Sequence, residues 1–242
     1  MRDYLHDIIQ HTTNLGVIDL IKIVGSDKET LIKAVSEDRT IVMNARFKAV
    51  APDFTGVYGM PNLPKLKTII GFDEYDEHAT IAMTRQQRDG EDIPVSIHFE
   101  NKAGDFINDY RLMSRVLVEE KVADVIFNGA TWHVDFEPKV NSIIRMKKQA
   151  QANSDEDAFT VKTDKGNLKI FFGNPSSHSG NFVFEAGVSG ALQKGWSWPV
   201  KQFLSILELA GDKHVYISDQ GAMRITVDSG LIDYEYLLPA KK

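Results

Sequence analysis

Alternation between apolar and polar side chains is the commonest pattern along this chain, and it predicts β-strands. The clearest examples are residues 31–35, 40–43, 95–99, 168–172 and 215–218. Polar turns of about two to five residues, rich in Gly, Asp and Ser, separate segments of this kind. Turns this short join antiparallel strands, because a parallel crossover needs about a dozen residues or more.

Only four segments show the spacing of apolar residues that is typical of an amphipathic helix. They cover residues 3–15, 64–70, 138–152 and 199–210. The later two begin 135 residues after the earlier two, and strand-like segments lie between the members of each pair. The order helix, strands, helix, strands occurs twice, which predicts an α+β protein of two similar domains. Two unrelated α+β halves with coincident spacing are the alternative.

The periodicity also predicts which side of each helix faces a core. The expected inward residues are Leu5, Ile8, Ile9 and Thr12 in the first helix, Val140, Ile143, Ile144 and Lys147 in the third, and Val200, Phe203, Leu204 and Leu207 in the fourth. The expected outward residues are Asp3, Asp7, Gln10 and Asn14 in the first helix and Asn141, Arg145, Lys148 and Ala152 in the third.

The segment between the two halves, residues 116–130, contains Val, Leu, Ile and Phe and is not a Gly/Ser linker. Its apolar side chains are expected to pack on the flanking domains. The sequence therefore predicts an N-terminal domain over residues 1–115, a connecting segment over 116–130 and a C-terminal domain over 131–242.

Composition narrows the possible chemistry. The 242 residues include 34 acidic and 28 basic side chains, for a net charge of −6, and no cysteine. The lack of cysteine excludes thiol nucleophiles, disulfides and cysteine-ligated metals, and it fits a reducing cytoplasm. No apolar run approaches the ~20 residues of a membrane helix. Phosphate-binding, dinucleotide-binding and zinc-protease motifs are absent from the sequence. We therefore expect a cytoplasmic protein without catalytic activity, metal, other cofactor or membrane partner.

Positive charge gathers on or beside the predicted helices of this acidic chain. The basic side chains concerned are Lys65, Lys67, Lys139, Arg145, Lys147, Lys148, Lys194 and Lys201. A basic helix surface on an otherwise negative protein favours contact with nucleic-acid phosphates. Ordinary solvated lysines are the alternative. No base-reading helix or aromatic RNA platform accompanies these side chains.

The last twelve residues, 231–242, form a predicted strand with an apolar tail that ends at a proline. If this tail is exposed, it would form a sticky patch, and such patches usually bind a partner. The alternative is that the tail covers the core of the second domain.

These features together resemble a DNA polymerase sliding clamp of the ring-forming, proliferating-cell-nuclear-antigen type. Residues 108–113 (Asn-Asp-Tyr-Arg-Leu-Met), running into 116–120 (Val-Leu-Val-Glu-Glu), resemble the last strand of the first clamp domain entering the interdomain connector. Residues 212–242, with their Tyr-x-Tyr-Leu-Leu-Pro-Ala-Lys ending, resemble a clamp C-terminus. The chain looks most like the short trimeric clamps of tailed bacteriophages.

The resemblance implies a clamp fold, in which each domain packs two helices on antiparallel sheets and three subunits close into a six-domain ring. The helices would line the hole and meet the backbone of encircled double-stranded DNA without sequence preference. The expected function is processivity in DNA replication. The expected partners are further copies of this chain, a replicative DNA polymerase and an ATP-dependent clamp loader, in the host cell cytoplasm if the protein is viral.

The resemblance also implies two protein-binding sites. A hydrophobic pocket under the connecting segment would take short apolar partner peptides. Its implied residues are Arg39, Ile41, Leu117, Val122, Val125, Tyr236, Leu238 and Pro239. The strand around 107–113 would pair with the strand 181–186 of the next subunit. The implied interface residues are Ile107, Tyr110, Leu112, Phe182 and Phe184.

Two other classes of protein stay open on the sequence alone. A β-rich two-domain structural or protein-binding module of a phage particle would share the hairpins and the lack of catalytic motifs, but it has no use for basic helices. An enzyme with dispersed catalytic residues, such as a carboxylate-pair hydrolase, is less favoured because no chemically active side chains cluster.

Overall fold

Two compact units make up the protein, and each is described separately. The computed structural model describes residues 1–88, 90–122 and 129–241. The first unit comprises Met1–Val125 and Ser229–Tyr234, and the second comprises Ile126–Asp228 and Glu235–Lys242. The segment Ser229–Tyr234, which the sequence analysis placed in the second domain, thus belongs to the first unit. The domain boundaries given above stay a prediction.

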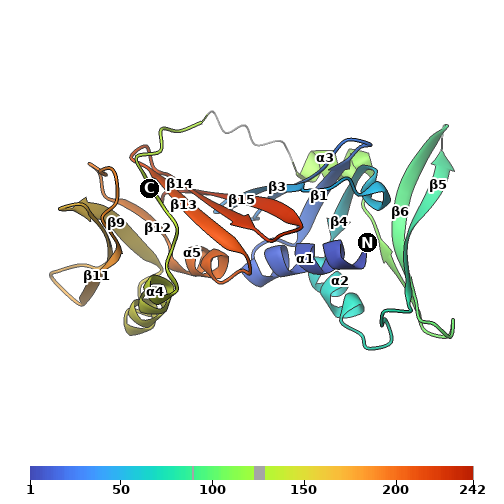
Figure 1. Ribbon diagram of the computed structural model, residues 1–242, viewed down its shortest axis with the longest axis horizontal. Coiled ribbons are helices and arrows are strands. Elements are labelled where there is room, and N and C mark those ends of the chain that lie inside the picture. Colours follow the sequence, from blue (N-terminus) through green and yellow to red (C-terminus); the bar gives the residue numbers. More distant parts are fainter. Residues whose placement is uncertain (89, 123–128, 242) are drawn as a thin grey trace. The chain divides into compact units, whose positions relative to one another are not determined.

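The first unit contains two antiparallel sheets, and helices cover one of them. Its helices are α1 (Arg2–Thr12), α2 (Leu63–Ile70) and α3 (Arg115–Lys121). Its strands are β1 (Leu20–Gly25), β2 (Thr30–Val35), β3 (Val42–Phe47), β4 (Gly56–Pro61), β5 (Thr80–Arg88), β6 (Glu91–Glu100) and β7 (Ile107–Arg111). The strand orders are β4-β1-β2-β3 and β5-β6-β7. α1 and α2 lie side by side under the four-stranded sheet (Figure 1).

The second unit has a similar plan, with two helices and two antiparallel sheets. Its helices are α4 (Val140–Ala152) and α5 (Val200–Leu207). Its strands are β8 (Val134–Phe136), β9 (Ala158–Asp164), β10 (Asn167–Gly173), β11 (Ser179–Ala186), β12 (Trp196–Pro199), β13 (Asp212–Ser218), β14 (Ala222–Asp228) and the part of β15 (Ile232–Pro239) that follows Tyr234. The strand orders are β15-β14-β13-β8 and β11-β10-β9-β12. The α+β class with antiparallel sheets is therefore confirmed.

Side-chain alternation produces the cores, because successive residues of a strand point to opposite faces of the sheet. In β14, Met223, Ile225 and Val227 are buried, while the residues between them are partly exposed. On α1, all four predicted inward residues are buried. α5 buries Ile206 where Leu204 was expected, and Leu204 is half-buried.

A fifth helix, α3, was missed, so the expectation of only four helices is wrong. α3 has seven residues, three of them Val or Leu at its start, and this is too short for a helical period to stand out from a strand pattern. Its side chains Arg115 and Glu119 bond at 3.0 Å across one helical turn.

The predicted inward face of α4 is also wrong. Val140 and Ile144 are 72% and 44% exposed, whereas Ser142 and Met146 are buried. The Ser142 hydroxyl donates to the carbonyl O of Phe184 on β11 at 2.6 Å. The helix therefore approaches β11 through a small polar residue, and a pattern that counts only apolar residues selects the wrong side.

The C-terminal tail covers the core of the second unit, and its described apolar residues do not form an exposed patch. Tyr236, Leu237 and Leu238 are buried, and the Trp198 indole N–H donates to the carbonyl O of Leu238 at 3.1 Å. The backbone of Lys241 bonds to Ser197, and its ammonium lies 2.8 Å from Asp157.

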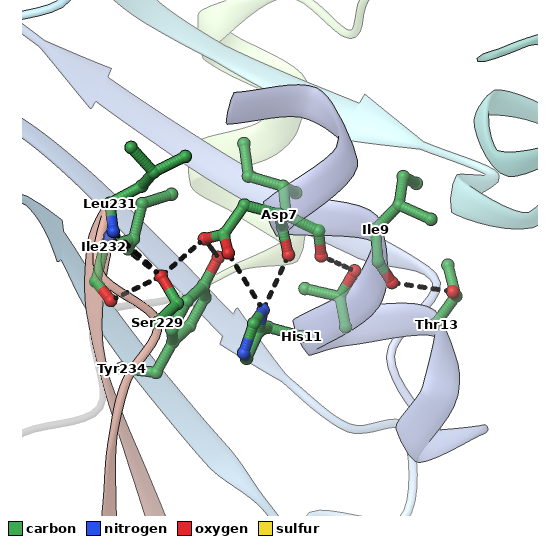
Figure 2. A network of polar contacts seen from close by, with 10 residues as sticks. Asp7, Ile9, His11, Thr13, Ser229, Leu231, Ile232 and Tyr234 are labelled. Atoms are coloured by element: carbon green, nitrogen blue, oxygen red, sulfur yellow. Dashed lines mark hydrogen bonds and ion pairs between the residues drawn. The ribbon is translucent and has the colours of Figure 1, made fainter. Parts of the chain in front are cut away.

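A buried carboxylate on α1 holds the segment Ser229–Tyr234 in the first unit (Figure 2). Asp7 was expected to face solvent, but it is buried. Its Oδ2 accepts hydrogen bonds from the Ser229 hydroxyl at 3.0 Å and the Tyr234 hydroxyl at 2.8 Å. The His11 ring stacks on the Tyr234 ring, with centroids 4.4 Å apart. The first unit thus depends on residues more than a hundred positions downstream.

Tyr234→Phe should lower the midpoint of urea unfolding of the first unit. The change keeps the ring but removes one donor to the buried Asp7 carboxylate, and hydrogen bonds to charged groups contribute about 1.5–3 kcal/mol. Urea unfolding followed through the NMR signals of the α1 backbone amides measures the effect. Tyr4→Phe is the matched control, because the Tyr4 ring stacks on Phe47 and no hydrogen bond of its hydroxyl is recorded within the described chain. Equal midpoints for Tyr234→Phe and wild type would contradict this role of Asp7.

Candidate DNA-facing helices and partner-docking helix

Three of the four helices that pack on the sheets carry cations and no carboxylate. α2, α4 and α5 together contain six cations and no Asp or Glu, on a chain with a net charge of −6. All six cationic side chains are exposed. A helix surface that carries cations without carboxylates favours contact with a polyanion.

Three of these cations reach solvent without a recorded bond to their ammonium groups within the described residues. They are Lys65 on α2, Lys148 on α4 and Lys201 on α5, and all three are exposed. Lys65 uses its backbone N–H, rather than its side chain, to bond the Asn62 side chain that caps α2. These ammonium groups are the ones most available to a phosphate.

The other three helix cations have partners in the protein. Lys67 donates to Asn14 at 3.1 Å, and Lys147 lies 2.7 Å from Glu208. Arg145 donates to the carbonyl O of Val183 at 3.2 Å. Exposed bonds of this kind contribute little, so these side chains remain able to exchange partners.

Lys139 and Lys194 lie outside the helices proper. Lys139 directly precedes α4 and pairs with the buried carboxylate of Glu185. Lys194 lies between β11 and β12, with its ammonium 5.9 Å from the centre of the Trp196 ring. The role of all eight predicted DNA-facing residues stays a prediction.

α3 is fastened to the sheet and turns two large apolar side chains to solvent. Gly59 and Met113 exchange both backbone hydrogen bonds, which brings the chain onto β4 just before α3. A Cβ at Gly59 would lie 2.8 Å from Cγ2 of Val118, so only glycine allows this approach. Val116 and Leu117 on the other side are 75% and 50% exposed. An exposed apolar pair on an ordered helix is suited to binding a partner.

The eight predicted pocket residues are spread over both units. In the first unit, Arg39 and Leu117 are exposed, and Ile41 and Val122 are buried. In the second, Pro239 is exposed, and Tyr236 and Leu238 are buried. Val125 lies outside the described residues. The exposed members could meet a peptide directly, and the buried ones could only support the surface, so the pocket stays a prediction.

The two strands expected at the subunit interface each pair on one side only within the described chain. β7 is the edge of the sheet β5-β6-β7, and β11 is the edge of β11-β10-β9-β12. Ile107 on β7 is exposed and Leu112 is half-buried, while Tyr110 is buried with its hydroxyl bonded to Pro61. Phe182 and Phe184 on β11 are buried. Free edges of this kind readily accept another strand.

Within the described residues, no group of three or more His, Asp or Glu side chains is placed to hold a metal ion. None of the helices formed by these residues is long and apolar enough to cross a membrane.

The likeness to known proteins is one of fold. No family model and no curated protein matches the chain. A solved PCNA (proliferating cell nuclear antigen) of A. fulgidus, bound to the C-terminal region of FEN-1, covers 100% of this chain and 96% of its own at 11% identity, with a TM-score of 0.70. PCNA of Thermococcus kodakaraensis covers 100% and 97% at 10% identity and a TM-score of 0.68. PCNA of Entamoeba histolytica covers 98% and 96% at 12% identity and a TM-score of 0.69.

The chain therefore has the fold of PCNA-type sliding clamps, and this fold extends over its whole length. The predicted resemblance to such clamps is confirmed at the level of fold. Identities of 10–12% show the fold alone, and a fold does not by itself determine an activity.

His98, on β6 beside the β7 edge, should make stability depend on pH. Its Nε2 lies 3.1 Å from Glu100 and its Nδ1 3.0 Å from Asp109, and these bonds raise the pKa of the imidazole above its ordinary value. The protonated form is favoured in the folded state. Its stabilisation is therefore complete below about pH 6.5, the value for an unfolded histidine, and is lost as pH rises through the raised pKa.

The stability of wild type relative to His98→Gln should consequently be larger near pH 6 than near pH 8, as measured by urea unfolding at both values. Substitution of the exposed His78, which lies beside Glu77, is the control. A difference between wild type and His98→Gln that does not change with pH would contradict this account.

Proposed function

We propose that this protein is a non-catalytic sliding clamp that encircles duplex DNA as a homotrimer and tethers the replicative DNA polymerase. The observation that carries the proposal is the charge of the helices. Within a PCNA fold of net charge −6, α2, α4 and α5 hold six cations and no carboxylate. A phage-particle binding module would have no use for this separation of charge.

The proposed contact with DNA is loose and electrostatic. Lysine ammonium groups meet phosphates without reading bases, so the contact is independent of sequence and weakens with salt. α1 presents Asp3 and Gln10 and adds no net positive charge, which shifts the contact toward α2, α4 and α5. Retention on DNA would come from encirclement, and weak contacts then permit sliding.

The proposed ring uses the two free sheet edges. β7 of one subunit would pair with β11 of the next, and a head-to-tail contact of this kind closes when the rotation completes a circle. Pairing would also remove both edges from solvent. The expected ring has three subunits, as in the short trimeric clamps of tailed bacteriophages.

The proposed partners dock near α3. A solved PCNA structure holds the C-terminal region of FEN-1, which shows that another protein of this fold binds a terminal segment of a partner. Here Val116 and Leu117 offer an apolar surface for such a segment. Replicative polymerase and an ATP-dependent clamp loader would use it in the cytoplasm, where the DNA is copied.

Charge reversal on the helices tests the proposed DNA contact. Lys148→Glu with Lys201→Glu should reduce polymerase processivity on primed circular DNA several-fold, and it should make binding less sensitive to salt because fewer phosphates are neutralised. The matched control is Lys28→Glu with Lys162→Glu, which makes the same charge change at exposed lysines away from the helices. Processivity equal to wild type in the helix variant would contradict the assignment.

Molar mass by light scattering tests the proposed ring. The wild type should reach about 82 kDa, three times 27.2 kDa, in a concentration series. Ile107→Asp should shift this species toward the monomer, because it places a charge on the exposed face of β7. Val50→Asp, at another exposed apolar residue, is the control. A strict monomer at every concentration would overturn the ring.

A further inference from the structure

A buried ammonium holds the end of α3. Lys22 lies in β1 on the sheet face opposite to Ile21 and Ile23, yet it is only 5% exposed. Its Nζ donates to the carbonyl O of Val122, 3.0 Å away, at the C-terminal end of α3. Lysine is seldom buried unless its charge is bonded. The positions of Lys22 and of α3 therefore depend on each other.

Lys22 acts at the place where the chain leaves the first unit. Val122 is the last described residue before the segment 123–128, and its N–H donates to Val118 at 2.8 Å to close the final turn of α3. A cation at the C-terminal end of a helix is favoured by the helix dipole, and here it bonds one of the carbonyls that the helix leaves unpaired.

A second cation holds the chain where it enters the second unit. The Arg224 guanidinium lies 4.8 Å from the centre of the Trp132 ring and 4.0 Å from that of Tyr216. The next residue, His133, donates its backbone N–H to Ile217 at 2.9 Å. Glu235 lies 3.6 Å from Arg224 and orients the guanidinium. Stacking of arginine on aromatic rings thus fixes residues 132 and 133 on the sheet of the second unit.

We propose that Lys22 and Arg224 are positioning residues: Lys22 fixes the C-terminal end of α3, and Arg224 fixes Trp132 and His133, each within its own unit. This inference rests on the proposed function in one respect: α3 is taken to receive partner proteins. A site that is ordered before binding loses less conformational entropy when the partner arrives. Lys22 would supply that order at α3 without touching the partner, and Arg224 holds the chain where it is next described.

Hydrogen exchange of single backbone amides tests the proposal on the protein alone. Lys22→Met should speed exchange at Val118 and Val122 by about tenfold or more, because it removes a hydrogen bond from a charged donor. It should leave His133 unchanged. Arg224→Met should speed exchange at Thr131 and His133 about threefold or more, because it removes the stacked cation. It should leave Val118 unchanged.

Two control variants match the chemistry. Arg46→Met removes an exposed cation of β3, on the same sheet as Lys22, where it pairs with Glu29 at 3.1 Å. Lys162→Met removes a cation that lies 5.8 Å from the Phe171 ring in the second unit. Neither should alter exchange at the four reporter amides. Lys22→Arg, which keeps a donor, should restore most of the protection at Val122.

Two results would overturn the proposal. One is wild-type exchange at the reporter amides in both Met variants. The other is acceleration spread evenly over all amides of a unit, which would show general loss of stability instead of local positioning. These rates need no DNA or partner, so they stand apart from the clamp proposal. If the clamp proposal alone fails, exchange still responds as described, while processivity is absent in the wild type as well.

Discussion

Burial of one side of each helix against an antiparallel sheet determines which side chains this protein presents to its surroundings. On α5 the buried residues Val200, Phe203, Ile206 and Leu207 leave Lys201 facing outward. α2 follows the same logic and presents Lys65, whereas α4 packs through Ser142 and Met146 and presents Lys148. Since hydrophobic burial stabilises the helix and orients its opposite side at once, the cationic surface is a direct consequence of core packing.

The sequence pattern predicted this arrangement where apolar residues alone make the contact. α1, α2 and α5 fall close to their expected bounds, and the predicted face of α1 is correct. The pattern failed where a polar residue makes the contact: Ser142 brings α4 to β11, and Asp7 is buried by bonds from Ser229 and Tyr234. None of these hydrogen bonds has a local signal in the sequence, because the bonded residues lie far apart along the chain.

The candidate sites also contain some features that the sequence pattern predicts and others that only the fold reveals. Lysines on helices are visible in the sequence, because their spacing and the lack of nearby carboxylates are local properties. The supports of α3 are not visible, since Lys22 and Gly59 lie far upstream and look like ordinary strand residues. The apolar pair Val116 and Leu117 was noted as part of the connecting segment, but its place on a helix needed the fold. Under the proposed function, weak contacts to DNA and a firmly held helix α3 would suit a protein that slides and still retains its partners.

Covalent closure around DNA tests encirclement most directly, and the lack of cysteine in the chain makes it feasible. Ile107→Cys with Asn181→Cys places one thiol on each free edge, at exposed residues of β7 and β11. After closure with a flexible bismaleimide on circular DNA, cross-linked trimers should remain with the circle in denaturing detergent and be released when a restriction enzyme cuts it. Equal retention on circular and linear DNA, or a lack of cross-linked trimers, would contradict a ring that encloses the duplex.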